Sequence, residues 1–193
     1  MDAERGDGRQ LFMRAPRWES ASCLANSTGG SNPARKGAAT FSYVPALTLS
    51  AKAGADERTE AQHIRQAFLV PGDTKPYMSA NVPGQTAKDP LHRTVSAARI
   101  DKNRAAAVKQ CKRYWGANYT DGGKKECDEY PFASTYERAA ENYSDPEVTK
   151  FNFSAKPIAT EDNQAGGSIL KSFYAKNRII DGLDDAFIVK ITG

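Results

Sequence analysis

Two adjacent carboxylates, Asp128 and Glu129, stand between a cysteine and a group of aromatic residues with a proline. The stretch reads Cys127-Asp128-Glu129-Tyr130-Pro131-Phe132. Its aromatic residues favour burial, whereas taking an ionised carboxylate out of water costs several kcal/mol unless a cation or hydrogen bonds compensate. The fold must therefore supply a partner for these acids, which is typical of a functional site, or leave them in a solvated turn.

The chain has three cysteines, Cys23, Cys111 and Cys127. We expect a disulfide between Cys111 and Cys127, because these two bracket a polar, glycine-containing segment, whereas Cys23 lies alone in a Ser/Gly/Asn-rich stretch. Such a bridge closes a loop of about 15 residues and contributes roughly 3 kcal/mol if the compartment is oxidising. Zinc binding is the weaker alternative, since neither cysteine has a Cys-x-x-Cys neighbour or a histidine at ligand spacing.

Residues 1–40 are rich in Gly, Ser, Ala and charged residues and contain few large apolar side chains. This composition predicts a flexible N-terminal segment or linker, followed by one folded domain over residues 41–193. The mean hydropathy is -0.63, which is typical of a water-soluble protein. No apolar run is long enough for a membrane span, and the first residues lack the apolar run of a signal peptide.

Hydrophobic periodicity predicts helices over residues 56–69 and 96–111, and a third that begins at Thr160, whose hydroxyl would cap it. Strands are expected at 41–50, 151–156 and 186–191, and Pro45 restricts the first to a sheet edge or a bulge. The pair Gly166-Gly167 weakens the third helix, and such positions often permit close approach of backbone or ligand. The order of elements predicts an α+β fold with a small antiparallel sheet and packed helices.

Two charged or titratable residues border apolar helix stripes. His63 lies beside Ile64 and Ala67, a place where histidine is usually a packed residue and less often a ligand or base. Arg104 falls at helical spacing with Ile100 and Val108. Its side chain either extends to water or reaches an anion in a cleft, where the planar guanidinium suits a phosphate or carboxylate.

Several blocks of the C-terminal half occur together in one order: residues 127–137, 152–154, 161–167 and 173–182. They include Asp128-Glu129-Tyr130-Pro131 and Glu161-Asp162-Asn163. Weaker similarity extends back through residues 101–104, 91–93 and 62–64. Together these blocks resemble the NucA/NucB family of secreted bacterial deoxyribonucleases, particularly its actinobacterial-type members, over roughly residues 60–193.

The resemblance implies endonucleolytic cleavage of DNA with a divalent cation, on a fold similar to the ββα-metal nucleases. It places Asp128 and Glu129 as the acidic pair and Asn163 as the metal-binding amide. Related members often have an arginine directly after the Asp-Asn pair, where this chain has Gln164. Lys176 or Arg178 would then supply the missing phosphate contact. The resemblance also implies that the protein is secreted.

The oxygen donors of Asp128, Glu129 and Asn163 suit Mg²⁺ or Mn²⁺. In an extended segment the first two side chains point to opposite faces, so only one would lead directly into the site unless the backbone bends. We place Asp128 nearest the chemistry, with Glu129 as a ligand or as a partner of the ligands, and His63 as a rival base. Arg104, Lys176 and Arg178 would grip the substrate by sequence-independent phosphate contacts.

The expected function is therefore a metal-dependent, sequence-nonspecific endodeoxyribonuclease that acts as a monomer on DNA, without membrane association. The net charge of +4 fits a polyanionic partner but does not require one. One alternative is a non-catalytic nucleic-acid-binding or interaction module, in which the acidic pair only makes ion pairs. Another is the nuclease domain of an antibacterial toxin, which would also require an inhibitor protein.

Overall fold

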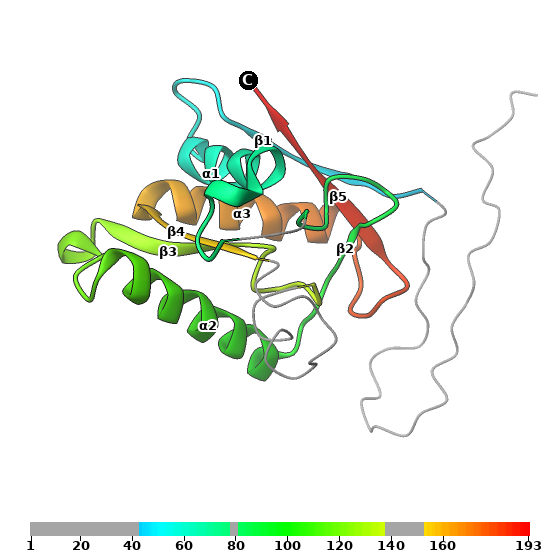
Figure 1. The fold of residues 1–193 in the computed structure, drawn as a ribbon. Helices are drawn as coiled ribbons and strands as arrows, with labels where there is room; N and C mark the ends of the chain where they lie inside the picture. Colours follow the sequence, from blue (N-terminus) through cyan, green and yellow to red (C-terminus); the bar gives the residue numbers. More distant parts are fainter. Residues whose placement is uncertain (1–42, 78–80, 138–152) are drawn as a thin grey trace, which may run out of the picture. The chain divides into compact units, whose positions relative to one another are not determined.

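The computed structural model describes residues 43–77, 81–137 and 153–193 of the chain (Figure 1). The predicted flexible segment 1–40 lies outside these residues and stays a prediction. The described part has three helices, α1 (Arg58–Leu69), α2 (Ala97–Trp115) and α3 (Thr160–Lys176). Its strands are β1 (Ala46–Ser50), β2 (Leu91–His92), β3 (Lys125–Tyr130), β4 (Ser154–Ala159) and β5 (Ala186–Thr192), with two short 3-10 turns at Pro71–Asp73 and Asp121–Gly123. The predicted α+β class is confirmed.

The strands form two separate sheets. One has the order β1-β5-β2, and the other is the antiparallel pair β3-β4, with Lys125 opposite Ala159 and Tyr130 opposite Ser154. β1 runs parallel to β5, while β2 runs antiparallel to it. The predicted small antiparallel sheet corresponds to the β3–β4 pair, and the larger sheet is mixed. Its parallel pair joins the first and last strands, and local sequence patterns do not record which distant strands will pair.

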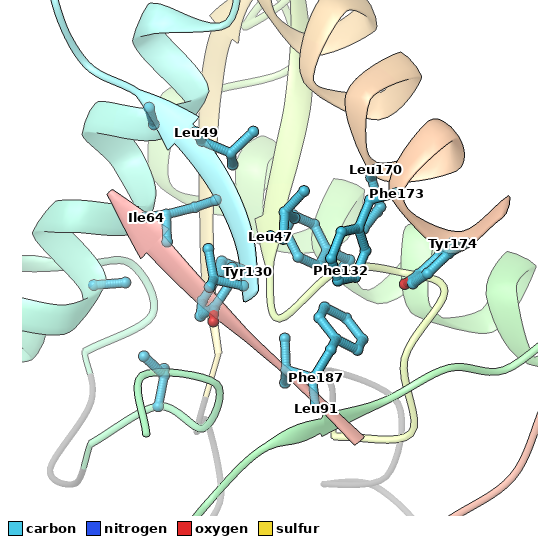
Figure 2. Close-up of a cluster of buried hydrophobic side chains, with 14 of the residues drawn as sticks. Leu47, Leu49, Ile64, Leu91, Tyr130, Phe132, Leu170, Phe173, Tyr174 and Phe187 are labelled. Carbon is cyan, nitrogen blue, oxygen red and sulfur yellow. The ribbon is translucent and has the colours of Figure 1, made fainter. Parts of the chain in front are cut away.

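The β3–β4 pair lies between helices, with α2 on one side and α1 and α3 on the other (Figure 1). The main core fills the space between α1, α3 and the three-stranded sheet. Figure 2 shows Leu47 and Leu49 of β1, Phe187 of β5 and Phe173 of α3 in this cluster. A smaller core lies under α2 and contains Ala106, Ala107, Cys111, Phe153 and Ala155.

Most of the predicted element bounds hold to within a few residues. α2 extends beyond the predicted Cys111 as far as Trp115, and Gly116 follows it with a φ of 82°, a conformation that favours glycine. β1 is an edge strand, as Pro45 predicts. Ala159 is the N-cap of α3, and the Thr160 hydroxyl donates to the Gly123 carbonyl instead of capping the helix (3.0 Å). The short strand β2 was not predicted.

The predicted disulfide joins Cys111 of α2 to Cys127 of β3, with the two Cα atoms 6.1 Å apart. It fixes the helix against the strand directly before Asp128. Among the described helices, none is long and apolar enough to cross a membrane.

Candidate active site

A cleft of about 1010 Å³ opens along β3 between α2 and α3. Residues that line it come from all three elements: Ile100, Arg104 and Val108 of α2, Glu126, Asp128 and Glu129 of β3, and Asn163, Gly167, Leu170 and Lys171 of α3. β3 pairs with β4 along one edge, and within the described residues no strand pairs with its other edge. The cleft follows that second edge. Side chains from both faces of the strand therefore reach it, and Asp128 and Glu129 both line the cleft, although only one of them was predicted to lead directly into the site unless the backbone bends.

Asp128 is buried and belongs to a chain of polar contacts. Its Oδ2 lies 2.6 Å from Nδ1 of His63, and Nε2 of His63 lies 2.7 Å from the Ser154 hydroxyl. A neutral ring with its proton on Nδ1 donates to Asp128 and accepts from Ser154. His63 is 1% exposed. With both nitrogens occupied in the interior, His63 holds the carboxylate of Asp128 in one orientation, and it does not itself line the cleft.

Glu60 of α1 is a further carboxylate at this site, and it was not among the predicted site residues. It is 3% exposed, and its Oε2 has no hydrogen-bond partner in the described part of the chain. Burial, followed by the nearby charges of Asp128 and Glu129, raises the pKa of Glu60 to about 10. A Cβ atom at Gly166 of α3 would lie 1.5 Å from Oε2 of Glu60, so the glycine permits the close approach that the sequence suggested.

Glu129 points to the other side of β3, toward α2. Burial and the neighbouring Asp128 raise its pKa to about 8, while the Arg104 guanidinium and the backbone N–H of Ala133 act in the opposite direction. Arg104 is exposed and lines the cleft with Ile100 and Val108, one helical turn away on each side. The Arg104 side chain is therefore exposed to water within the cleft, and its contact with a phosphate stays a prediction.

Asn163 and Gln164 both contact Glu126. The Asn163 side chain donates to Oε2 of Glu126 at 2.8 Å, and that of Gln164 donates to Oε1 at 3.4 Å. The amide oxygen of Asn163 is not used by this bond. Asp128, Glu129 and Asn163 thus line one cleft, as the resemblance suggested.

A sequence profile of the family Deoxyribonuclease NucA/NucB matches residues 78–190. The chain belongs to this family. The matched region includes the disulfide, the cleft-lining acids of β3, Arg104 and Asn163, whereas Glu60 and His63 precede it. Comparison with curated proteins and with solved structures gives no match. DNA is the substrate that membership of the NucA/NucB deoxyribonucleases implies.

In this NucA/NucB member, Lys176 and Arg178 do not belong to the set of described residues that line the cleft. Both are exposed near the end of α3, and Arg178 has a φ of 54°. Lys171, one turn earlier on α3, does line the cleft, as does Arg93, whose guanidinium also lies 4.7 Å from the centroid of the Tyr174 ring. These two basic residues were not predicted.

The donor atoms at the cleft fit a hard divalent cation. Within the described residues, no three His, Cys, Asp or Glu side chains form a group that could hold a metal ion. Mg²⁺ typically takes one or two carboxylates and keeps several waters. The unpaired Oε2 of Glu60 beside Asp128 and Glu129 is the observation that favours a cation here, because a cation would offset the buried negative charge.

A sequence signal for Glu60 did exist. Glu60 and His63 are three residues apart and share the helix face that carries Ile64 and Ala67, and all four are buried. A carboxylate on an apolar helix stripe, like the guanidinium of Arg104, must either extend to water or find a partner in a cleft. Glu126 and Ser154 carry no comparable signal, because their partners come from other elements.

Proposed function

We propose that this chain hydrolyses phosphodiester bonds within DNA strands, without sequence preference and with the help of a divalent cation, in the cleft along β3. The observation that carries the proposal is the buried Glu60 carboxylate, whose Oε2 has no partner among the described residues and whose pKa is raised by burial and by the charges of Asp128 and Glu129. Such carboxylates repel one another unless protons or a cation intervene.

Glu129 and Asn163 would hold Mg²⁺ or Mn²⁺, and Glu60 would join them on the α1 side. A bound divalent ion supplies charge neutralisation at phosphorus and stabilisation of the leaving oxygen. The amide of Asn163 contributes its oxygen while its nitrogen stays bonded to Glu126. The bond to Glu126 fixes the direction of the amide.

Asp128 lies nearest the chemistry in this proposal. His63 occupies its Oδ2, which leaves Oδ1 to accept the proton of the attacking water. His63 acts as a positioning residue and replaces the rival base of the sequence analysis, because its ring is buried and bonded at both nitrogens. The Asp128 carboxylate only accepts and so selects the tautomer with its proton on Nδ1, and the Ser154 hydroxyl donates to Nε2.

Arg104 would hold a phosphate of the bound strand, with Lys171 and Arg93 as additional cleft contacts. Contacts of this kind read the backbone and carry no base information, which is the basis for the proposed lack of sequence preference. Lys176 and Arg178, which were predicted to grip the substrate, would contact the bound strand only outside the cleft.

A plasmid-nicking assay tests the proposal with Mg²⁺, Mn²⁺ and EDTA. We expect chelation to abolish nicking, and Asp128→Asn to lower the rate by roughly 10²- to 10⁴-fold, the usual range for loss of a general base. Glu129→Gln and Asn163→Ala should raise the concentration of metal needed for half-maximal rate, while the exposed Glu161→Gln serves as a matched control on α3. Nicking that persists unchanged in EDTA, or full activity in Asp128→Asn and Glu129→Gln alike, rejects the assignment.

Secretion remains a proposal. Its support is the Cys111–Cys127 disulfide, since such bridges form and persist in oxidising compartments. The monomeric state, the toxin role and an inhibitor protein remain predictions from the sequence.

A further inference from the structure

The last turn of α2 carries two exposed aromatic side chains. Tyr114 is 39% exposed and Trp115 is 41% exposed. Their rings meet edge to face, with centroids 6.0 Å apart. Gly116 ends the helix immediately afterwards. Packing in either hydrophobic cluster does not account for these rings, because neither residue belongs to one.

Positive charge is concentrated around the same turn. Residues 109–125 contain five Lys or Arg and one Asp, so their formal charge is +4, the same as the net charge of the whole chain. The Arg113 guanidinium lies 5.4 Å from the centroid of the Tyr114 ring, and Lys75 Nζ lies 5.8 Å from it. Cations in a last helical turn also favour the helix dipole. That effect explains Lys112 and Arg113 but not the exposed rings.

This segment is held next to the cleft. The Cys111–Cys127 disulfide joins its two ends and ties α2 to the strand that carries Asp128. Tyr119, Thr120 and Lys125, which belong to the same segment, line the cleft. Figure 1 shows α2 ending close to the start of β3. A nucleic-acid strand that leaves this end of the cleft would therefore meet the aromatic turn.

We propose that the end of α2, built on Tyr114 and Trp115 with Lys112 and Arg113, is an accessory surface that stacks unpaired bases of the DNA strand leaving the cleft. The inference rests on the proposed function, because that strand is the substrate. Bases inside a duplex are covered by their neighbours, so an exposed ring stacks on single-stranded bases while the cations hold the phosphates. The surface gives the enzyme a preference for DNA with single-stranded or frayed segments.

Trp115 provides a direct reading of base stacking. The sequence has two tryptophans, Trp18 and Trp115. In the full chain with Trp18→Phe, tryptophan fluorescence therefore comes from Trp115 alone. We expect its fluorescence to be quenched by an oligothymidylate of about twelve nucleotides in EDTA, and not by an abasic phosphodiester of the same length, which keeps the charge and lacks the bases. Gel analysis confirms that the oligonucleotide stays intact.

Variants give the size of the effect. Measured by the fluorescence anisotropy of a dye-labelled oligothymidylate, Trp115→Ala should weaken binding roughly 5- to 100-fold, and Trp115→Phe should weaken it less, because a ring is retained. The exposed Lys102→Ala, near the other end of α2, is the matched control and should change little. Equal binding of the abasic polymer, or unchanged binding by Trp115→Ala, overturns the proposal. Quenching by polyglutamate but not by oligothymidylate also overturns it, in favour of an acidic protein partner.

Cleavage kinetics separate this inference from the proposed function. Wild type and Trp115→Ala are compared on a duplex with a single-stranded tail and on a fully paired duplex of the same sequence. We expect the variant to raise KM for the tailed DNA, with kcat and the paired duplex unaffected. If wild type cleaves neither DNA with any divalent ion, the proposed function fails. If wild type cleaves both and the variant keeps the wild-type KM, the accessory surface alone is rejected.

Discussion

The two faces of the β3–β4 pair are held to their neighbours by different means. On the face toward α1, Asp128 is fixed by a buried hydrogen bond to His63, and Glu60 lies close by without a partner of its own among the described residues. On the face toward α2, a disulfide and small apolar side chains make the contact. The polar face fixes the direction of the Asp128 carboxylate and lowers stability, because buried charge is poorly solvated. The other face provides the covalent and apolar contacts, and it also carries Glu129 beside Arg104 of the cleft.

The largest expected effect comes from removing the partner of Asp128. His63→Ala should lower the free energy of unfolding by about 3–5 kcal/mol, because it leaves a buried carboxylate unpaired. Urea denaturation measures this loss, and the exposed Gln62→Ala on the same helix is the control. A loss below that of an ordinary surface substitution would show that His63 does not hold Asp128.

Removing the Cys111–Cys127 disulfide should lower the free energy of unfolding by less than His63→Ala does. Replacing both cysteines, Cys111→Ala with Cys127→Ala, should lower the free energy of unfolding by roughly 3 kcal/mol, because the unfolded chain regains loop entropy. Dithiothreitol should reduce the stability of wild type by a similar amount and leave the double variant unchanged. A double variant as stable as oxidised wild type would contradict the role assigned to the disulfide.

Glu60 sharpens the comparison through pH. Its pKa in the folded protein is about 10 against an ordinary value of 4.5, so the folded state binds this proton more tightly than the unfolded state. The contribution of Glu60 to the free energy of unfolding is therefore fully present below pH 4.5, its ordinary pKa. The contribution is lost as pH rises toward the pKa of the folded state. Glu60→Gln removes this fall and should stabilise the metal-free protein by about 1–3 kcal/mol at alkaline pH.

Urea unfolding in EDTA at about pH 5 and about pH 8 compares the two proteins. The advantage of Glu60→Gln should appear at the higher pH. Added Mg²⁺ or Mn²⁺ should raise the Tm of wild type more than that of the variant, because ligand binding to the folded state stabilises it. An equal shift in both proteins would place the cation away from Glu60.

The smallest effects come from the neighbouring glycines of α3. Gly166→Ala forces a Cβ against the Glu60 carboxylate and should destabilise the protein by about 1–3 kcal/mol. Gly167→Ala meets nothing within 4 Å and should stabilise the helix by about 0.5–1 kcal/mol. Thermal unfolding of the two variants measures the loss of stability expected for Gly166→Ala and the gain expected for Gly167→Ala. Destabilisation by Gly167→Ala, or none by Gly166→Ala, would contradict the contact between α1 and α3.

Much of the local structure follows from the sequence. Periodicity predicts α1, α2 and β5, the proline at position 45 predicts an edge strand, and the spacing of the cysteines predicts the bridge. The carboxylate pair and Asn163 were identified through the resemblance to a family, and they line one cleft. The same reasoning missed Glu60, although its place on an apolar stripe was a visible signal, because no family block included it.

The sequence by itself determined that this chain has a disulfide-tied α+β domain of the NucA/NucB deoxyribonucleases, and it predicted that acids and an amide form the site. The tertiary structure decided which groups meet. The parallel pairing of β1 with β5, the bond from His63 to Asp128 across 65 positions and the approach of Glu60 to Gly166 all join distant segments. Local patterns report which residues favour burial, whereas the partner that each buried group finds depends on how helices and strands pack in space.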